Sequence, residues 1–311
     1  MTPRKVLILV CLIICFASTA WSQQQILNTQ YVFNRHLIHP GFTGIGGRLQ
    51  ASLLVRNQWR GINGAPTTQA LSIHAPINYD KTFSLGGIVI RDKIGVTTQT
   101  GVYMTAAYQL QVNEDTYVSF GLQGGFLNDQ SNFSELPGFV DDPIFVSENL
   151  STFRPNFGAG IYLVNKQFHF GLSVPNLVEQ KFDQFTFQEG ADIQRFFYID
   201  TGYGFTIRED LVLDVSTLFK MQAGAPTQFD INGVLGYRKF IWLGTSYRSF
   251  ESFDVLFRIK MGRDYYFGYS YDLATGPVTL SRVDTGSHEF HLQFGMSELT
   301  RKINRKKRFR R

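Results

Sequence analysis

The chain has 311 residues, including 29 Phe, 14 Tyr and 29 Gly, with a formal net charge of +5. Residues 301–311 alone carry eight of the basic side chains, and the body between the leader and this tail is net acidic. The basic pI therefore gives no indication of a nucleic-acid-binding domain. Both cysteines, Cys11 and Cys15, lie in the leader, which excludes disulfides, thiolate metal sites and cysteine nucleophiles from the rest of the chain.

Residues 1–22 have the pattern of a secretory signal peptide. A basic start precedes an apolar run at 6–16, and small residues then prepare cleavage before Gln23. About a dozen apolar residues are too few for a spanning anchor, and no later stretch is apolar over the roughly eighteen residues that a transmembrane helix needs. We expect an exported chain in which residues 23–47 form an N-terminal periplasmic segment.

From residue 48 onward, stretches of about ten residues alternate apolar and polar side chains. Val118, Phe120 and Leu122, for example, alternate with small or polar neighbours. Alternation of period two indicates a strand with one apolar and one polar face. The predicted strands are 48–59, 67–77, 82–92, 98–111, 116–127, 152–164, 168–175, 192–207, 211–222, 227–237, 240–249, 253–261, 265–273 and 287–296.

The connections between these strands alternate between tight turns and mostly longer loops. Outer-membrane barrels combine short periplasmic turns with longer outer loops, and bacterial single-chain barrels have an even number of strands. The sequence therefore predicts an all-β fold, a closed antiparallel transmembrane β-barrel of about 14 strands over residues 48–297, with both termini periplasmic. A soluble sandwich or propeller is less compatible, because no repeat of 40–45 residues is present.

The sequence offers little for catalysis or metal binding. The six histidines are scattered, Asp141 and Asp142 lack the spaced ligands of a calcium loop, and no nucleophile motif is present. We expect no enzyme, cofactor or metal. The inward phase is charged, which fits either a salt-bridged lumen or a water-filled pore. These charged positions are Arg56, Arg154, Asp200, Asp214, Lys220, Asp230, Arg238, Asp254, Arg258, Lys260, Asp272 and Glu289.

Several short blocks together resemble one known family. They are Gln30-Tyr31-Val32-Phe33-Asn34, His39-Pro40-Gly41-Phe42-Thr43-Gly44, the run from Arg56 to Gln69, Ser72-Ile73-His74-Ala75-Pro76, Asp92-Lys93-Ile94-Gly95, Tyr269-Ser270-Tyr271-Asp272 and Gly286-Ser287-His288-Glu289. In order and spacing this series resembles the PorP/SprF outer-membrane proteins of the type IX secretion and gliding system. The similarity covers essentially the whole mature chain, apart from the basic tail.

The resemblance implies a non-enzymatic outer-membrane protein that helps to export or anchor a secreted surface protein, often an adhesin, by binding its C-terminal signal domain. The partners it implies are outer-membrane lipid, the secreted substrate, and periplasmic or outer-membrane secretion components, with no nucleic acid. A passive porin or small-molecule transporter of the outer membrane is the alternative function.

Two groups of residues are candidates for partner contact. The first follows the first strand and has the turn-forming residues and amphipathic tryptophan suited to an outer loop. Its members, which also carry the family resemblance, are Arg56, Asn57, Gln58, Trp59, Gly61, Asn63, Gly64 and Pro66. The second is the tail at 298–311, a periplasmic arm suited to docking on acidic proteins or anionic lipid. Its basic residues are Arg301, Lys302, Arg305, Lys306, Lys307, Arg308, Arg310 and Arg311.

Overall fold

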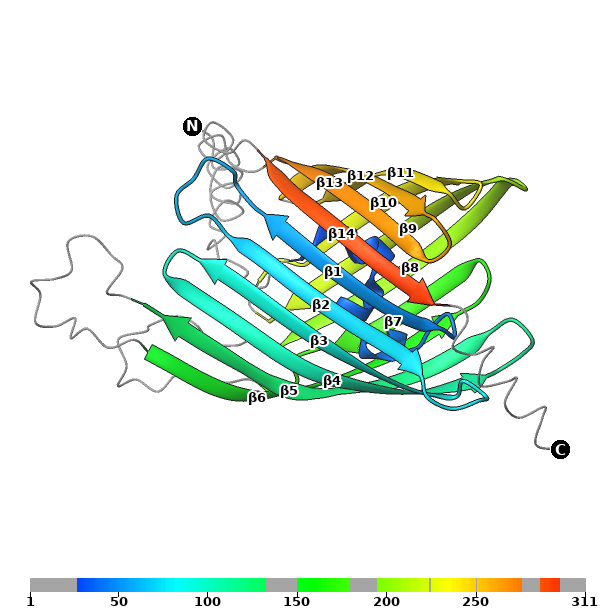
Figure 1. Ribbon diagram of the computed structural model, residues 1–311, viewed down its shortest axis with the longest axis horizontal. Coiled ribbons are helices and arrows are strands. Elements are labelled where there is room, and N and C mark those ends of the chain that lie inside the picture. The colour runs from blue at the N-terminus through cyan, green and yellow to red at the C-terminus, as the bar shows by residue number, and fades with distance from the viewer. Residues whose placement is uncertain are drawn as a thin grey trace, which may run out of the picture.

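The computed structural model describes most of the chain after the leader. The described residues are 27–132, 150–178, 195–223, 225–249, 251–275 and 286–296. They form one barrel, whose strands run at a slant to its long axis, together with three short helices inside it (Figure 1).

Fourteen strands form the closed sheet, as the sequence predicts. Each strand pairs antiparallel with its neighbours in the chain, and β1 closes the barrel against β14, from Leu49 opposite Met296 to Asn57 opposite His288. Closure pairs every strand edge, which a sheet in hydrocarbon requires. The strands are β1 Leu49–Asn57, β2 Thr67–Pro76, β3 Phe83–Ile94, β4 Thr97–Gln111, β5 Tyr117–Ser131, β6 Leu150–Val164, β7 Phe168–Val174, β8 Phe196–Arg208, β9 Leu211–Gln222, β10 Gln228–Tyr237, β11 Ile241–Arg248, β12 Ser252–Met261, β13 Tyr265–Ala274 and β14 Ser287–Met296.

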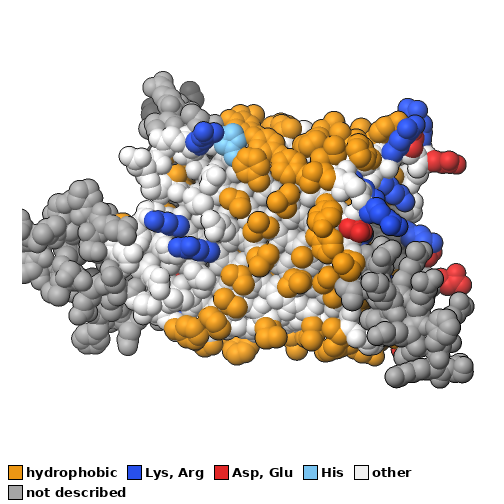
Figure 2. Space-filling view, viewed as in Figure 1, with side chains coloured by type: hydrophobic (Ala, Val, Ile, Leu, Met, Phe, Trp, Pro, Cys, Tyr) orange, Lys and Arg blue, Asp and Glu red, His pale blue; other side chains and the backbone are white. Residues whose placement is uncertain are grey.

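The outer face carries the apolar half of the alternation. In β5, Phe120 and Leu122 are exposed on the outside, whereas Ser119 between the flanking outward positions is buried inside. Hydrophobic side chains gather in a band across the barrel wall, and charged side chains gather toward its ends (Figure 2). Such a band is the lipid-facing surface of an outer-membrane barrel.

The two ends of the barrel differ in their connections. Even-numbered connections are tight, as at Arg238 and Lys239, where both residues have φ 52° between β10 and β11. Positive φ at two consecutive residues is typical of the two-residue hairpin turn that matches strand twist. Arg238 was expected to face inward, and that prediction was wrong, because the residue belongs to this exposed turn. We call this the even-turn end, and the opposite one the odd-loop end.

Residues 27–47, within the segment 23–47 that was expected to be periplasmic, run through the lumen of the barrel, and we call them the plug. The plug contains three 3-10 helices, η1 Thr29–Phe33, η2 Arg35–Leu37 and η3 Pro40–Phe42. Helix η1 packs against β12, β13 and β14, and η3 packs against β4 to β7 on the other side of the lumen (Figure 1). Among the described residues, no helix is long and apolar enough to cross a membrane.

Substitution of Leu122 tests which side chains of the strands face the lipid. Its side chain is 67% exposed, midway along the outward apolar positions of β5. Arginine at the bilayer midplane costs about 2–4 kcal/mol in barrels. Leu122→Arg should lower the free energy of unfolding in lipid vesicles by that amount, measured by urea titration. Glu114→Arg, in the exposed turn before β5, is the control and should change it by less than about 0.5 kcal/mol. Equal losses of unfolding free energy in the two variants would contradict the assignment of Leu122 to the lipid-facing side.

Candidate functional site: the plugged lumen

The plug is fixed at the odd-loop end by one wall carboxylate. Glu289 on β14 accepts hydrogen bonds from two successive plug amides, from Thr29 N to Oε2 at 2.9 Å and from Gln30 N to Oε1 at 2.7 Å. Thr29 Oγ1 also donates to Asp272 at 3.1 Å. Charge-assisted hydrogen bonds of this kind are about twice as strong as neutral ones. The start of η1 is therefore bound by backbone atoms as well as side chains.

Arg56 supplies the positive charge for this carboxylate pair. Its Nη1 lies 2.6 Å from Asp272 Oδ2 and 3.0 Å from Glu289 Oε2, and it donates to Thr29 Oγ1 at 3.0 Å. The Arg56 side chain is 1% exposed. A buried guanidinium survives when it is paired and hydrogen-bonded. Arg56 thus joins β1, β13, β14 and the plug into one network.

A second buried arginine continues the network along the wall. Arg248, at the end of β11, pairs with Asp230 at 3.1 Å and with Glu251 at 3.4 Å. Its Nη1 also donates to the carbonyl of Leu27 in the plug at 3.1 Å. Glu251 lies in the loop after β11; partial burial opposes its ionisation, but the charges of Arg248, Arg56 and Lys220 together lower the pKa of its carboxyl below the usual range.

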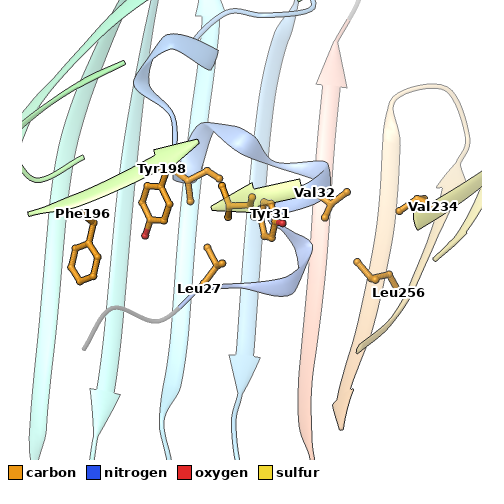
Figure 3. Packing of buried hydrophobic residues seen from close by; sticks show 9 residues of the cluster. Leu27, Tyr31, Val32, Phe196, Tyr198, Val234 and Leu256 are labelled. Carbon is orange, nitrogen blue, oxygen red and sulfur yellow. The ribbon is translucent and has the colours of Figure 1, made fainter. Parts of the chain in front are cut away.

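An apolar cluster holds the next part of the plug. Leu27, Tyr31 and Val32 of the plug pack against buried side chains on the wall from β8 to β12 (Figure 3). The wall members are Phe196, Tyr198, Leu218, Val234 and Leu256. Tyr31 also satisfies its hydroxyl, which accepts a hydrogen bond from Asn232 Nδ2 at 2.8 Å. A buried tyrosine needs such a partner, and this one sets how Tyr31 lies in the cluster.

The centre of the plug is held by further polar contacts, one to β8 and one to β4 on the other side of the lumen. Arg35 Nε donates to Asp200 on β8 at 2.8 Å. His36 Nε2 lies 2.9 Å from Thr105 Oγ1 on β4, and the rings of His36 and His74 are 4.6 Å apart edge to face. The plug therefore touches both sides of the barrel within a few residues of chain.

Helix η3 lies directly on the backbone of the wall. A Cβ at Gly121 of β5 would come within 2.2 Å of the carbonyl carbon of Pro40, and one at Gly41 would come within 3.2 Å of Gly160 O and Ser119 O. Only glycine permits an approach this close. The inward glycines of β5 and β6 thus form the cradle of η3.

The described residues of the plug occupy the lumen and contact the wall on both sides. The described residues contain no group of three or more His, Cys, Asp or Glu side chains placed to hold a metal ion. Apolar packing at one wall, ion pairs at the mouth and backbone contact at the other wall together fix the plug. The ion pairs of Arg56 and Arg248 are those expected of a salt-bridged lumen, one of the two alternatives that the sequence left open.

The first group of candidate contact residues divides into buried and exposed members. Arg56, Gln58 and Pro66 are buried, and Arg56 serves the plug network. Asn57, Trp59, Gly61, Asn63 and Gly64 are exposed at the odd-loop end. The backbone there is fixed, because Trp59 N donates to Ser287 Oγ at 3.3 Å and Arg60 N donates to Gly286 O at 3.2 Å. The basic tail at 298–311 and the Asp141-Asp142 pair lie outside the described residues; docking by the tail stays a prediction, which pull-downs of truncated protein across a salt series would test.

Sequence reasoning missed the plug and two of the arginines that fix it, Arg35 and Arg248. The signal was present in the composition of the segment, because Tyr31, Val32 and Phe33 are too apolar for a solvated linker. Glycine at inward positions such as Gly121 also left lumen space that a wall side chain would otherwise fill.

Comparison with solved structures finds outer-membrane barrels. The chain is similar to the toluene transporter TbuX of Ralstonia pickettii, with 9% identity, a TM-score of 0.51 and coverage of 84% of this chain and 92% of that one. It is also similar to the CymD monoaromatic hydrocarbon channel, with 9% identity, a TM-score of 0.50 and coverage of 87% and 93%. At this identity the likeness concerns the fold alone, which is that of an integral outer-membrane protein.

Comparison with protein families gives a more specific result. The model of a family described as type IX secretion system membrane protein PorP/SprF matches residues 20–294. Among curated proteins, no match was found. The matched range includes the plug and all fourteen strands except the last residues of β14.

Arg56 is the first test of the plug network. Arg56→Ala leaves Asp272 and Glu289 buried without their counter-charge, a change that typically costs about 3–5 kcal/mol. Urea unfolding in vesicles should show a loss of this size. The control is Arg238→Ala, which breaks an exposed pair with Asp210 at 3.6 Å and should cost less than about 1 kcal/mol. A loss at Arg56 no larger than the control would contradict a network that stabilises the fold.

The glycine cradle gives a test of closure. Gly121→Leu places a side chain where Pro40 lies and should displace η3. We expect this variant to conduct across a planar bilayer and the unaltered protein to be silent. Gly124→Leu on the same strand faces outward, where a Cβ would meet only the ring of Phe157 at 3.6 Å, and should stay silent. Steady conductance of the unaltered protein would refute closure by the plug.

Proposed function

The chain belongs to the PorP/SprF family of type IX secretion system membrane proteins, and we propose that it helps to export or anchor a secreted surface protein by binding that protein's C-terminal signal domain. It acts as a non-enzymatic binding component of the outer membrane. Its partners are the secreted substrate and other components of the secretion system, with membrane lipid around the barrel wall.

The filled lumen is the observation that carries this proposal. The plug contacts β4 to β7 through η3 and β12 to β14 through η1, and its core residues are buried. A lumen occupied from wall to wall is poorly suited to passive diffusion, which is what the porin alternative requires. If solutes do not pass through the lumen, the surfaces that remain for function are the loops and turns at the two ends of the barrel. Such surfaces are suited to binding other proteins.

The exposed loop between β1 and β2 is the best-supported contact surface. Its backbone is held in one conformation by bonds to Gly286 and Ser287, so binding there would order few residues. Trp59 has φ 47° and remains 37% exposed, and Gly61 and Gly64 have φ of 110° and 76°. Exposed tryptophan on a fixed backbone is typical of residues that dominate protein interfaces. We expect Trp59 and Asn63 to contact the partner.

Substitution in this loop tests the proposal. Trp59→Ala and Asn63→Ala should abolish co-purification of the secreted partner from membranes and reduce its amount at the cell surface by at least tenfold, as expected from losing about 1.4 kcal/mol or more of binding. Heat-modifiable migration should show an intact barrel in both variants. Asn113→Ala, in an exposed turn at the opposite end, is the control and should leave partner recovery unchanged.

Two outcomes would contradict the assignment. Loss of the folded barrel in the Trp59 variant would make the loop a closure element of the hairpin. Normal surface display of every secreted protein in cells that lack this chain would remove the secretion role itself.

A further inference from the structure

The plug crosses the barrel in a defined direction. Its last residues lie at the even-turn end, because β1 starts there. Gly44 N donates to His74 Nδ1 near the end of β2 at 2.9 Å, and Gln109 Nε2 near the end of β4 donates to Thr43 O at 3.1 Å. Gly47 lies close to Lys81 in the turn between β2 and β3. The chain therefore enters the wall from the inside, at the even-turn end.

The first described residues of the plug lie at the opposite end. Tyr31 bonds to Asn232, which pairs across strands with Ser246. Leu27 bonds to Arg248, two residues beyond Ser246 and the last residue of β11 before an odd-numbered loop. Going backward along the plug thus means going toward the odd-loop end.

We propose that the two ends of the chain leave the barrel on opposite sides of the membrane. The plug begins with Leu27 at the odd-loop end, whereas β14 ends with Met296 at the even-turn end, opposite Leu49 at the start of β1. An even number of strands places both ends of the barrel sheet on one side, but the plug carries the chain across the lumen once more. This proposal differs from the expectation that both termini are periplasmic.

Chain length leaves no room for a return path. If cleavage occurs before Gln23, four residues precede Leu27, and they span at most about 14 Å. Leu27 lies near the level of Arg56, since Thr29, two residues further along the chain, bonds to Arg56. From Arg56 to Leu49 is seven residues of strand, about 23 Å of strand length, or about 18 Å along the axis at a tilt of ~40°. Four residues cannot reach the even-turn end.

This placement rests on the proposed function in one respect, because that proposal sets the odd-loop end toward the cell surface. The start of the plug then lies at the same end of the barrel as the loop that carries Trp59. Both the start of the plug and this loop are held by the same strand, since Ser287 of β14 bonds to Trp59 N and Glu289 bonds to Thr29 N.

Epitope accessibility tests the inference. A short epitope is inserted between Gln24 and Gln25, and in separate proteins after Asn63 in the first odd loop and after Glu114 in an even turn. Antibody is applied to intact cells and to cells with a permeabilised outer membrane. The protein with the N-terminal epitope also carries Val32→Cys. Val32 is buried in the apolar cluster, so a cysteine at this position should resist maleimide as long as the plug stays in the lumen.

We expect the N-terminal epitope to be labelled under the same conditions as the Asn63 epitope and not those of the Glu114 epitope. If the N-terminal epitope is labelled under the conditions that label the Glu114 epitope, while Val32→Cys stays protected from maleimide, the inference is wrong. If Val32→Cys reacts, the inserted epitope has unseated the plug, and the insertion is replaced by Gln25→Cys, whose labelling must follow a cysteine at Asn63. If the N-terminal and Asn63 epitopes are both labelled only after permeabilisation, the proposed orientation of the barrel is wrong. The inference that the two chain ends lie on opposite sides would still hold.

Discussion

The neutralisation of buried charge in the lumen is the constraint on which the rest of this structure depends. Five carboxylates of the wall and its loop, from Asp230 to Glu289, surround Arg56 and Arg248 at one end of the barrel. Each arginine also contacts the plug, directly at Leu27 or through Thr29. Removing water from these groups is favourable only if partners replace it. The plug supplies part of that replacement, so wall and plug stabilise one another.

The same constraint accounts for the distribution of residue types inside the barrel. Where the plug presents apolar side chains, the wall places buried apolar residues against them, as at Leu218 of β9 and Leu256 of β12. Where the plug backbone approaches β5, the inward residue is Gly121. Where the plug presents Arg35, the wall provides Asp200. The inner face of the barrel is complementary to one particular peptide, which is more specific than the polar lining of an open channel.

Sequence reasoning recovered the barrel because membrane burial imposes period two on every strand. The fourteen predicted strands correspond to those observed, with differences of a few residues at their ends, such as β5 reaching Ser131. The plug followed no such period, since 3-10 helices of three to five residues leave no repeating pattern. Its contacts join residues more than 200 positions apart, as between Thr29 and Glu289, and no local signal encodes them. The candidate loop joins β1 and β2, as the predicted strands imply, and Arg56 faces the lumen, as its inward phase predicted, whereas partner contact by the loop stays a prediction.

Hydrogen exchange of the plug amides in the folded, membrane-embedded protein tests the central claim most directly. The account predicts that the amides of Thr29 and Gln30, which donate to the buried Glu289, exchange as slowly as those of the neighbouring strand β14. Exchange of these two amides at the rate of an unstructured peptide, with β14 still protected, would contradict a plug that forms part of the folded barrel.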